Sequence, residues 1–232
     1  MTTFALVHGA WHGAWSWERL VEPLERRGHG ALAVDLPGED PDAGLDEYAD
    51  IVAAFLTPFD DDVVVVGHSL NGLVLPLVAA RRPVRAIVYL TAFIPVEGQS
   101  MNDQFAAATM PILTMQDRPE RDRHGRTHWP DEAAARRALY PDLTDEDAAW
   151  AFAQLRPQAP TTQSQPHLAG LPPVRAASII GAYDAAMNPE WLRLITRERL
   201  GTDPIELEAG HFPMISEPEA LADALDAVSS AP

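Results

Sequence analysis

Four consecutive valines at positions 63–66 stand directly before the sequence Gly67-His68-Ser69-Leu70-Asn71-Gly72. A run of β-branched residues that ends at a turn signal predicts a strand buried on both faces of a sheet. A sequence of the G-x-S-x-G type after such a strand predicts a sharp strand-to-helix turn, which exposes the serine hydroxyl above the end of the sheet. An ordinary turn between a strand and a helix can have a similar sequence, so the rest of the chain must show whether Ser69 is a nucleophile.

Strands and helices alternate on both sides of this segment. Apolar runs predict strands at residues 4–7, 31–34, 63–66, 86–90, 176–181 and 204–207. Apolar residues at helical spacing predict helices from about Trp17, from Leu45, after Ser69 and from Asn188, and a final helix with Ser216 and Glu219 as a capping box. Strands joined through helices predict an α/β fold, with a mostly parallel sheet and helices on both of its faces.

The alternation stops between about residues 96 and 171. No buried strand is predicted there, and helical patterns occupy residues 132–139 and 144–155. We therefore expect residues 1–232 to form a single domain, whose core comprises residues 1–95 and 172–232. The insertion at about residues 96–171 is expected to form a helical lid over the ends of the strands.

Composition excludes several classes of protein. The chain has 34 acidic and 17 basic residues, a formal charge of −17, which opposes binding to nucleic acid or to an anionic membrane surface. It has no cysteine, so disulfides and thiolate metal sites are excluded. The start of the chain lacks a signal-peptide pattern, and no apolar stretch approaches the roughly 20 residues that span a bilayer. These features predict a cytoplasmic protein without a membrane partner.

A serine becomes a useful nucleophile when a histidine takes its proton and a carboxylate orients that histidine. Asp184 follows the second-to-last predicted strand and His211 follows the last one. In a parallel sheet both would emerge at the same edge as Ser69, in the chain order Ser, Asp, His. Taken alone, a histidine is more often a surface residue and such an aspartate as often a turn residue, whereas Asp203 precedes its strand and should face the opposite edge. The convergence predicts Ser69, His211 and Asp184 as catalytic residues.

An oxyanion intermediate also needs two hydrogen-bond donors held in place. The N–H of Leu70 is one candidate, and the N–H of Ala10, in the loop after the first strand, is the other. In the same loop, His12 is expected either to contact the substrate or to hold the loop closed. Trp11 and Phe212 are expected to line the pocket or to pack beneath it. Trp11, His12 and Phe212 are thus the predicted substrate-binding residues.

Metal and nucleotide chemistry have no visible motif in the chain. There is no H-E-x-x-H or other close spacing of metal ligands, and there is no G-x-G-x-x-G sequence or P-loop. We therefore predict neither a metal nor a cofactor, and a small-molecule ester as the partner of the site.

The chain resembles the α/β-hydrolase superfamily in its N-terminal sequence His8-Gly9-Ala10-Trp11-His12-Gly13-Ala14-Trp15, the elbow, Asp184 and Gly210-His211. More narrowly it is similar to the small methylesterase and hydroxynitrile-lyase branch and its bacterial esterase relatives, nearly from end to end. The resemblance implies that Ser69 is the nucleophile, His211 the general base and then acid, and Asp184 the orienting carboxylate, with oxyanion donors at Ala10 and Leu70. Asn71 departs from the pattern, because the family has glycine there.

The expected function is that of a serine hydrolase that cleaves small to medium, largely apolar carboxylic esters through an acyl-enzyme. Two alternatives stay open: a carbon–carbon lyase like the hydroxynitrile lyases, and a ligand-binding or polyketide-pathway helper on the same fold. The resemblance implies that the lyase branch has threonine in place of Gly9 and lysine in place of Phe212. Replacing both residues in this way is expected to favour lyase chemistry.

Overall fold

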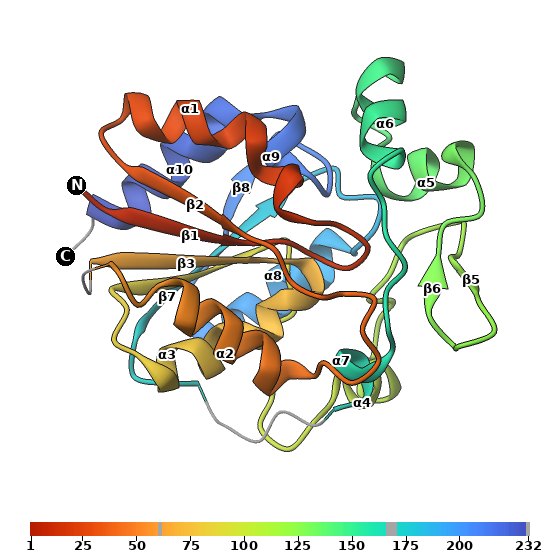
Figure 1. The fold of residues 1–232 in the computed structure, drawn as a ribbon, viewed down its shortest axis with the longest axis horizontal. Coiled ribbons are helices and arrows are strands. Elements are labelled where there is room, and N and C mark those ends of the chain that lie inside the picture. The colour runs from red at the N-terminus through yellow and green to blue at the C-terminus, as the bar shows by residue number, and fades with distance from the viewer. Residues whose placement is uncertain (60–61, 166–170, 231–232) are drawn as a thin grey trace.

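The computed structural model describes residues 1–59, 62–165 and 171–230, and a parallel sheet runs through its centre (Figure 1). The strand order is β2-β1-β3-β4-β7-β8, and each neighbouring pair is parallel. The strands are β1 (Thr3–Val7), β2 (Gly30–Val34), β3 (Val63–His68), β4 (Ala86–Leu90), β7 (Arg175–Gly181) and β8 (Ile205–Leu207). The predicted α/β fold, with its mostly parallel sheet, is thereby confirmed.

Helices cover both faces of this sheet, as predicted (Figure 1). Helices α1 (Glu18–Arg26) and α10 (Pro218–Ser230) pack on one face, and α2 (Leu45–Phe55), α3 (Leu75–Arg81) and α8 (Pro189–Leu200) pack on the other. Val64 and Val66 enter the first layer, whereas Val63 and Val65 enter the second. Because successive side chains of a strand point to opposite faces, a strand between two apolar layers needs an unbroken apolar sequence.

The segment between β4 and β7 lies at the carboxyl ends of the strands (Figure 1). It contains α4 (Met101–Ala107), the short strands β5 (Glu120–Arg121) and β6 (Thr127–His128), α5 (Glu132–Leu139), α6 (Asp145–Phe152) and α7 (Thr161–Ser164). Helix α5 has the predicted bounds, and α6 ends three residues before the predicted end. Helices α4 and α7 were not predicted, because they are too short to have a clear apolar period. Residues 166–170 of the predicted insertion lie outside the described residues.

Two helix starts differ from the predictions. The helix after Ser69 begins as the 3₁₀ helix η2 (Ser69–Val74), which continues directly into α3. The capping box predicted at Ser216 and Glu219 is wrong, because Ser216 ends the short helix α9 (Pro213–Ser216) and α10 begins at Pro218. Proline suits the first position of a helix, since its missing N–H would have no partner there.

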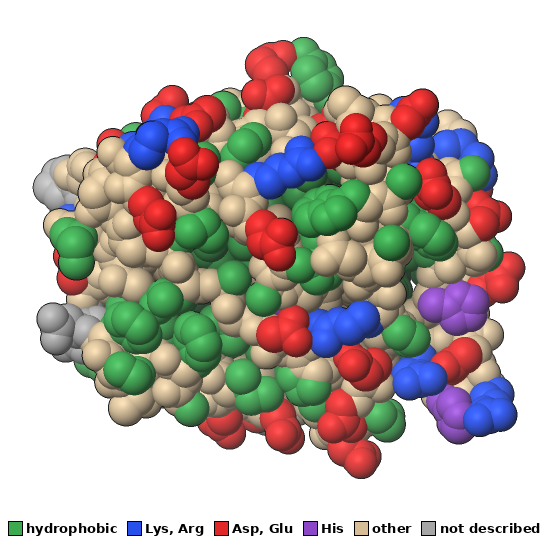
Figure 2. Space-filling view, turned by 45° about the horizontal axis from the view of Figure 1, so that its top comes forward, with side chains coloured by type: hydrophobic (Ala, Val, Ile, Leu, Met, Phe, Trp, Pro, Cys, Tyr) green, Lys and Arg blue, Asp and Glu red, His purple; other side chains and the backbone are tan. Residues whose placement is uncertain are grey.

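Acidic side chains are spread over the face seen in Figure 2, with arginines among them. Arg27 pairs with Glu219 and Asp223, and Arg81 pairs with Asp46 and Asp50. Exposed pairs of this kind contribute little to stability.

Within the described parts of the chain, no helix combines the length and the apolar character needed to cross a membrane.

Candidate active site

Ser69 lies directly after β3, in a backbone conformation that residues other than glycine rarely adopt. Its φ angle is 55°, in the left-handed region. Such strain persists where the surroundings hold it, and here two glycines allow close packing. A Cβ atom at Gly72 would lie 2.2 Å from the Phe93 carbonyl oxygen, and one at Gly67 would lie 2.8 Å from the Asn71 carbonyl oxygen. The elbow therefore requires glycine at both positions.

The structure brings the side chains of Ser69, His211 and Asp184 together at this edge of the sheet. His211 Nε2 is 3.1 Å from Ser69 Oγ, and His211 Nδ1 is 2.6 Å from Asp184 Oδ2. The other oxygen, Asp184 Oδ1, accepts hydrogen bonds of 2.8 Å from the N–H groups of Ala186 and Met187. An ionised carboxylate can only accept, so His211 carries its proton on Nδ1 and presents the lone pair of Nε2 to the serine. This arrangement can take the proton of Ser69.

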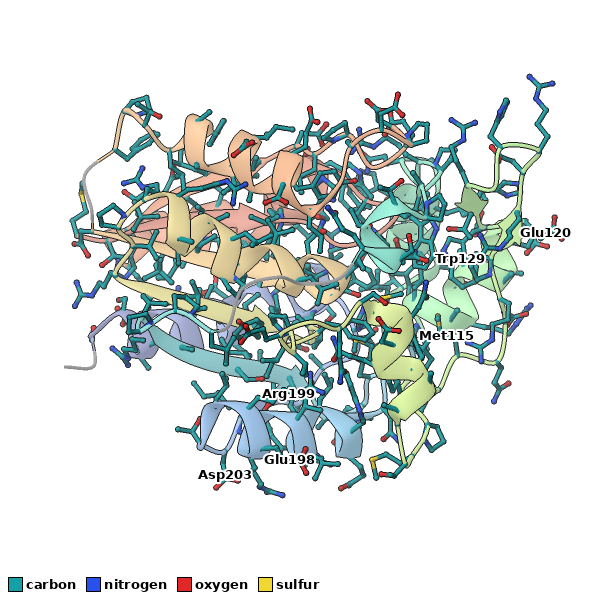
Figure 3. All side chains as sticks on the ribbon, turned by 90° about the horizontal axis from the view of Figure 1, so that it is seen from below. Met115, Glu120, Trp129, Glu198, Arg199 and Asp203 are labelled. Carbon is teal, nitrogen blue, oxygen red and sulfur yellow. The ribbon has the colours of Figure 1, made fainter. Side chains whose placement is uncertain are left out.

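Asp203, the acid that the sequence placed at the opposite edge, is far from these three residues. Its carboxylate accepts a 2.6 Å hydrogen bond from exposed Arg197. Figure 3 shows Asp203 near one end of α8, well away from Met115, which lines the cavity described below. Asp184 follows its strand and lies beside Ser69 and His211, whereas Asp203 precedes its strand and lies away from them, as the sequence predicted.

Hydrogen bonds from its own histidines help to hold the loop after β1, residues 8–13, which we call the oxyanion loop after the donor predicted at Ala10. His8 Nδ1 donates to the Gly9 carbonyl oxygen at 2.9 Å, and His12 Nδ1 donates to the Ala10 carbonyl oxygen at 2.7 Å. The Gly9 carbonyl and the Ala10 N–H belong to one trans peptide, so they point in opposite directions. The Ala10 N–H has no acceptor within the described residues. The Leu70 N–H, in the first turn of η2, likewise has no acceptor within its helix.

His12 and Phe212, which were expected to contact the substrate, are buried beneath the loop. His12 is 1% exposed, and its Nε2 accepts a hydrogen bond from the Tyr140 hydroxyl. Its ring stacks on those of Trp15 and Phe212. Neither His12 nor Phe212 lines the cavity next to Ser69, as far as the described residues define that cavity. The structure thus favours the other expectation for each residue: His12 holds the loop closed, and Phe212 packs beneath the pocket.

Burial keeps the histidines around the site neutral. It lowers the pKa of His8 to about 4 and that of His12 to about 3, although their hydrogen bonds to backbone carbonyls act in the opposite direction. Burial also lowers the pKa of His68 well below its usual value. These imidazoles therefore act as hydrogen-bonding groups at neutral pH rather than as charges.

We expect the free energy of unfolding to fall as the pH is lowered from 7 to 5. Unfolding returns His8 and His12 to water, where the pKa is about 6.5, so between pH 4 and pH 6.5 the unfolded chain binds more protons than the folded chain. Stability is then lost as the pH falls through 6.5, with a slope that approaches about 1.4 kcal/mol per pH unit for each histidine. Urea unfolding at pH 7, 6 and 5 measures this slope.

The His12→Gln variant should have a shallower dependence on pH than the wild type. The His124→Gln variant, which changes an exposed histidine, is the matched control and should keep the wild-type slope. A stability that stays constant or rises on acidification would contradict the burial of neutral imidazoles.

A cavity opens next to Ser69 and His211. The other described residues that line it are apolar apart from Gln163: Ala10, Trp11, Leu70, Phe93, Met101, Phe105, Leu113, Met115, Leu139, Ala186 and Met187. No Asp, Glu or Arg is among them. Trp11, one of the predicted substrate-binding residues, lines the cavity, and its indole N–H donates to Thr127 Oγ1 at 3.0 Å.

Within the described residues, no group of three His, Asp or Glu side chains is placed to hold a metal ion.

The chain is similar to several known proteins. A model of the alpha/beta hydrolase family matches residues 4–224. Methylesterase 2 of Arabidopsis thaliana is 28% identical over 250 residues, which cover 97% of this chain and 95% of that protein. Carbendazim hydrolyzing esterase of Nocardioides sp. (strain SG-4G) is 34% identical over 126 residues, so the matched part spans about half of its length, 52%, and 50% of this chain.

Solved structures agree in fold. A pyrethroid hydrolase from Sphingobium faniae JZ-2 has a TM-score of 0.84 at 24% identity, and the match covers 100% of this chain and 98% of that chain. Polyneuridine aldehyde esterase has a TM-score of 0.82 at 22% identity, and the match covers 99% of this chain and 100% of that chain. Because the family model matches nearly the whole sequence, the chain belongs to the alpha/beta hydrolase family.

Proposed function

We propose that the protein is a serine hydrolase that cleaves small to medium, largely apolar carboxylic esters through an acyl-enzyme. The observation that carries this proposal is the hydrogen-bonded series from Asp184 through His211 to Ser69 at the wall of an apolar cavity. The names of the relatives, which include methylesterases and other esterases, support the same reaction class.

The reaction follows from the positions of these groups. As Ser69 Oγ attacks the ester carbonyl carbon, its proton moves to His211 Nε2, and the carbonyl oxygen becomes an oxyanion that accepts from the Ala10 and Leu70 N–H groups. Asp184 stabilises the imidazolium. His211 then gives the proton to the departing alcohol, which leaves an acyl group on Ser69. A water molecule, deprotonated by His211, attacks that acyl group and releases the carboxylic acid, and the proton returns to Ser69.

The composition of the cavity wall supports a neutral, apolar substrate. A charged substrate group would lose its hydration without gaining a counter-charge, which is strongly unfavourable. Several of the lining side chains are methionines, Met101, Met115 and Met187, and these flexible side chains adapt to ligands of different shape.

The segment between β4 and β7 acts in this proposal as a lid that is fastened to both catalytic loops. Tyr140 bonds to His12, and the Arg156 N–H donates to the Trp11 carbonyl oxygen at 2.8 Å. On the other side, Asp142 Oδ2 accepts a 2.7 Å hydrogen bond from the N–H of Gly210, which precedes His211. The part of the lid near these residues therefore supports the site rather than opening away from it.

Lyase chemistry fits the cavity less well. Cyanide leaves as an anion and needs a positive charge nearby, but no arginine is among the described residues that line the cavity, and the chain has no lysine. The two substitutions expected to favour lyase chemistry also do not fit. A Cβ at Gly9 would lie 2.6 Å from His68 Nδ1, and a lysine in place of buried Phe212 would place an amine among neutral histidines. We therefore expect this double variant to be unstable rather than to gain lyase activity.

We expect measurable hydrolysis of simple methyl and aryl esters and no cyanide release from mandelonitrile above the buffer background. The test is a panel of methyl, acetyl and longer acyl esters, assayed with the wild type and with Ser69→Ala. Cyanide release that depends on Ser69 and exceeds ester hydrolysis would support the lyase instead. Equally slow hydrolysis of every ester by both proteins would support the ligand-binding alternative.

A further inference from the structure

The buried amide of Asn71 links the two segments that carry the proposed oxyanion donors. Asn71 Nδ2 donates a hydrogen bond of 2.6 Å to the His8 carbonyl oxygen, and both residues are 1% exposed. A carbonyl oxygen can only accept, so the amide nitrogen must face it. Asn71 directly follows Leu70, and His8 lies two residues before Ala10. One side chain thus joins the elbow to the oxyanion loop, 63 residues apart in sequence.

The elbow is the fixed end of this link. The backbone on both sides of Asn71 packs closely, because Gly67 approaches the Asn71 carbonyl and Gly72 approaches the Phe93 carbonyl. The Phe93 N–H also donates to the Ser69 carbonyl oxygen at 3.1 Å. These contacts set the direction in which the Asn71 side chain leaves the backbone.

The oxyanion loop is the end that can adjust. Residues 8–13 form neither helix nor strand, and Trp11 has a φ of 65°, which residues with a side chain rarely adopt. A strained loop keeps its shape only where its surroundings determine it. The Nδ1 bonds of His8 and His12 lie within the loop, and further bonds reach the loop from Leu36 and from Tyr140 and Arg156 of the lid segment. The bond from Asn71, in contrast, comes from the helix η2, which begins at Ser69.

We propose that Asn71 is a positioning residue, which holds the Ala10 N–H at the correct distance from Ser69 and from the Leu70 N–H; this rests on the proposed ester hydrolysis. Donors stabilise an oxyanion most when they need not move during the reaction. The glycine that the G-x-S-x-G pattern has at this position could not make the link. Because the oxyanion forms in the transition state, loss of the link should lower kcat and leave KM unchanged.

Three substitutions test this role. Asn71→Ala and Asn71→Gly remove the amide, and each should lower kcat about three- to tenfold with KM within about twofold of the wild type. Asn71→Leu keeps about the size of the side chain but has no proton to donate, so its kcat should fall at least as far. If Asn71 only filled space, Asn71→Leu would be the mildest of the three.

The matched control is Thr196→Val, which removes a buried hydroxyl that donates to the Leu192 carbonyl oxygen at 2.7 Å, remote from the site. It should lower the melting temperature without changing kcat. Wild-type kcat in Asn71→Ala and Asn71→Gly, with a loss of melting temperature alone, would overturn the positioning role.

Hydrogen exchange gives a readout that does not depend on the reaction. In Asn71→Ala the amides of residues 8–13 should exchange faster than in the wild type, while the amides of α10 keep their rates. Unchanged exchange in the oxyanion loop would overturn the link whatever the activity. Ester hydrolysis by Ser69→Ala at the wild-type rate would instead refute the proposed function, so the two failures are distinguishable.

Discussion

The Ser69→Ala variant should lose about 10⁵- to 10⁶-fold in kcat for ester hydrolysis while it keeps its fold. The substitution removes the oxygen that His211 Nε2 faces at 3.1 Å. The residues of such a triad act as a unit, so His211 and Asp184 cannot compensate for the loss. The cavity and the two N–H groups remain, so KM should change little. Steady-state hydrolysis of an aryl ester by the two purified proteins measures the effect.

Ser178→Ala is the matched control for this substitution. Ser178 is a buried serine of β7 whose hydroxyl forms a 3.0 Å hydrogen bond with the Thr196 hydroxyl, on the α8 side of the sheet. We expect Ser178→Ala to keep the wild-type kcat. If Ser69→Ala kept more than about one hundredth of the wild-type kcat, another group would have to be the nucleophile.

The Asp184→Asn variant should have the second largest effect, a loss of about 10³- to 10⁴-fold in kcat. Asparagine can keep its oxygen on the Ala186 and Met187 N–H groups, which hold Asp184 Oδ1. Its NH₂ group would then face His211 Nδ1 and donate to it, so the proton of the ring would move to Nε2. A protonated Nε2 faces Ser69 as a second donor and cannot take the proton of the serine.

The pH dependence of kcat and the circular dichroism spectrum of Asp184→Asn separate this effect from unfolding. Asp203→Asn is the matched control, because it makes the same change in an exposed pair with Arg197. It should leave kcat unchanged. Wild-type activity in Asp184→Asn would mean that a different acid orients His211.

The fold and the meeting of Ser69, His211 and Asp184 at one edge of the sheet could be predicted because they depend on local signals. The valines before Gly67 predict a buried strand, and in a parallel sheet the chain position of an acid or a histidine after a strand determines the edge at which it lies. Asp184 and Asp203 were separated by this rule alone. The capping box at Ser216 failed because Pro218, which starts α10, was the stronger signal.

The surroundings of the site could not be predicted in the same way, because they depend on contacts between distant segments. His12 lies beneath the loop because its Nε2 accepts a hydrogen bond from the hydroxyl of Tyr140, 128 residues away. Met101 and Phe105 reach the cavity from α4, a helix of seven residues that gave too few turns for an apolar period. The partner of Asn71 is a backbone carbonyl, which no sequence pattern marks.

Covalent labelling with a fluorophosphonate, followed by mass spectrometry of the peptides, tests the central claim most directly. The reagent phosphonylates a serine that an adjacent base activates and that lies beside an oxyanion site. We predict one adduct, on Ser69, formed more slowly in Asp184→Asn and absent from Ser69→Ala. An adduct on another residue, or undiminished labelling of Ser69→Ala, would contradict the assignment of Ser69 as the nucleophile.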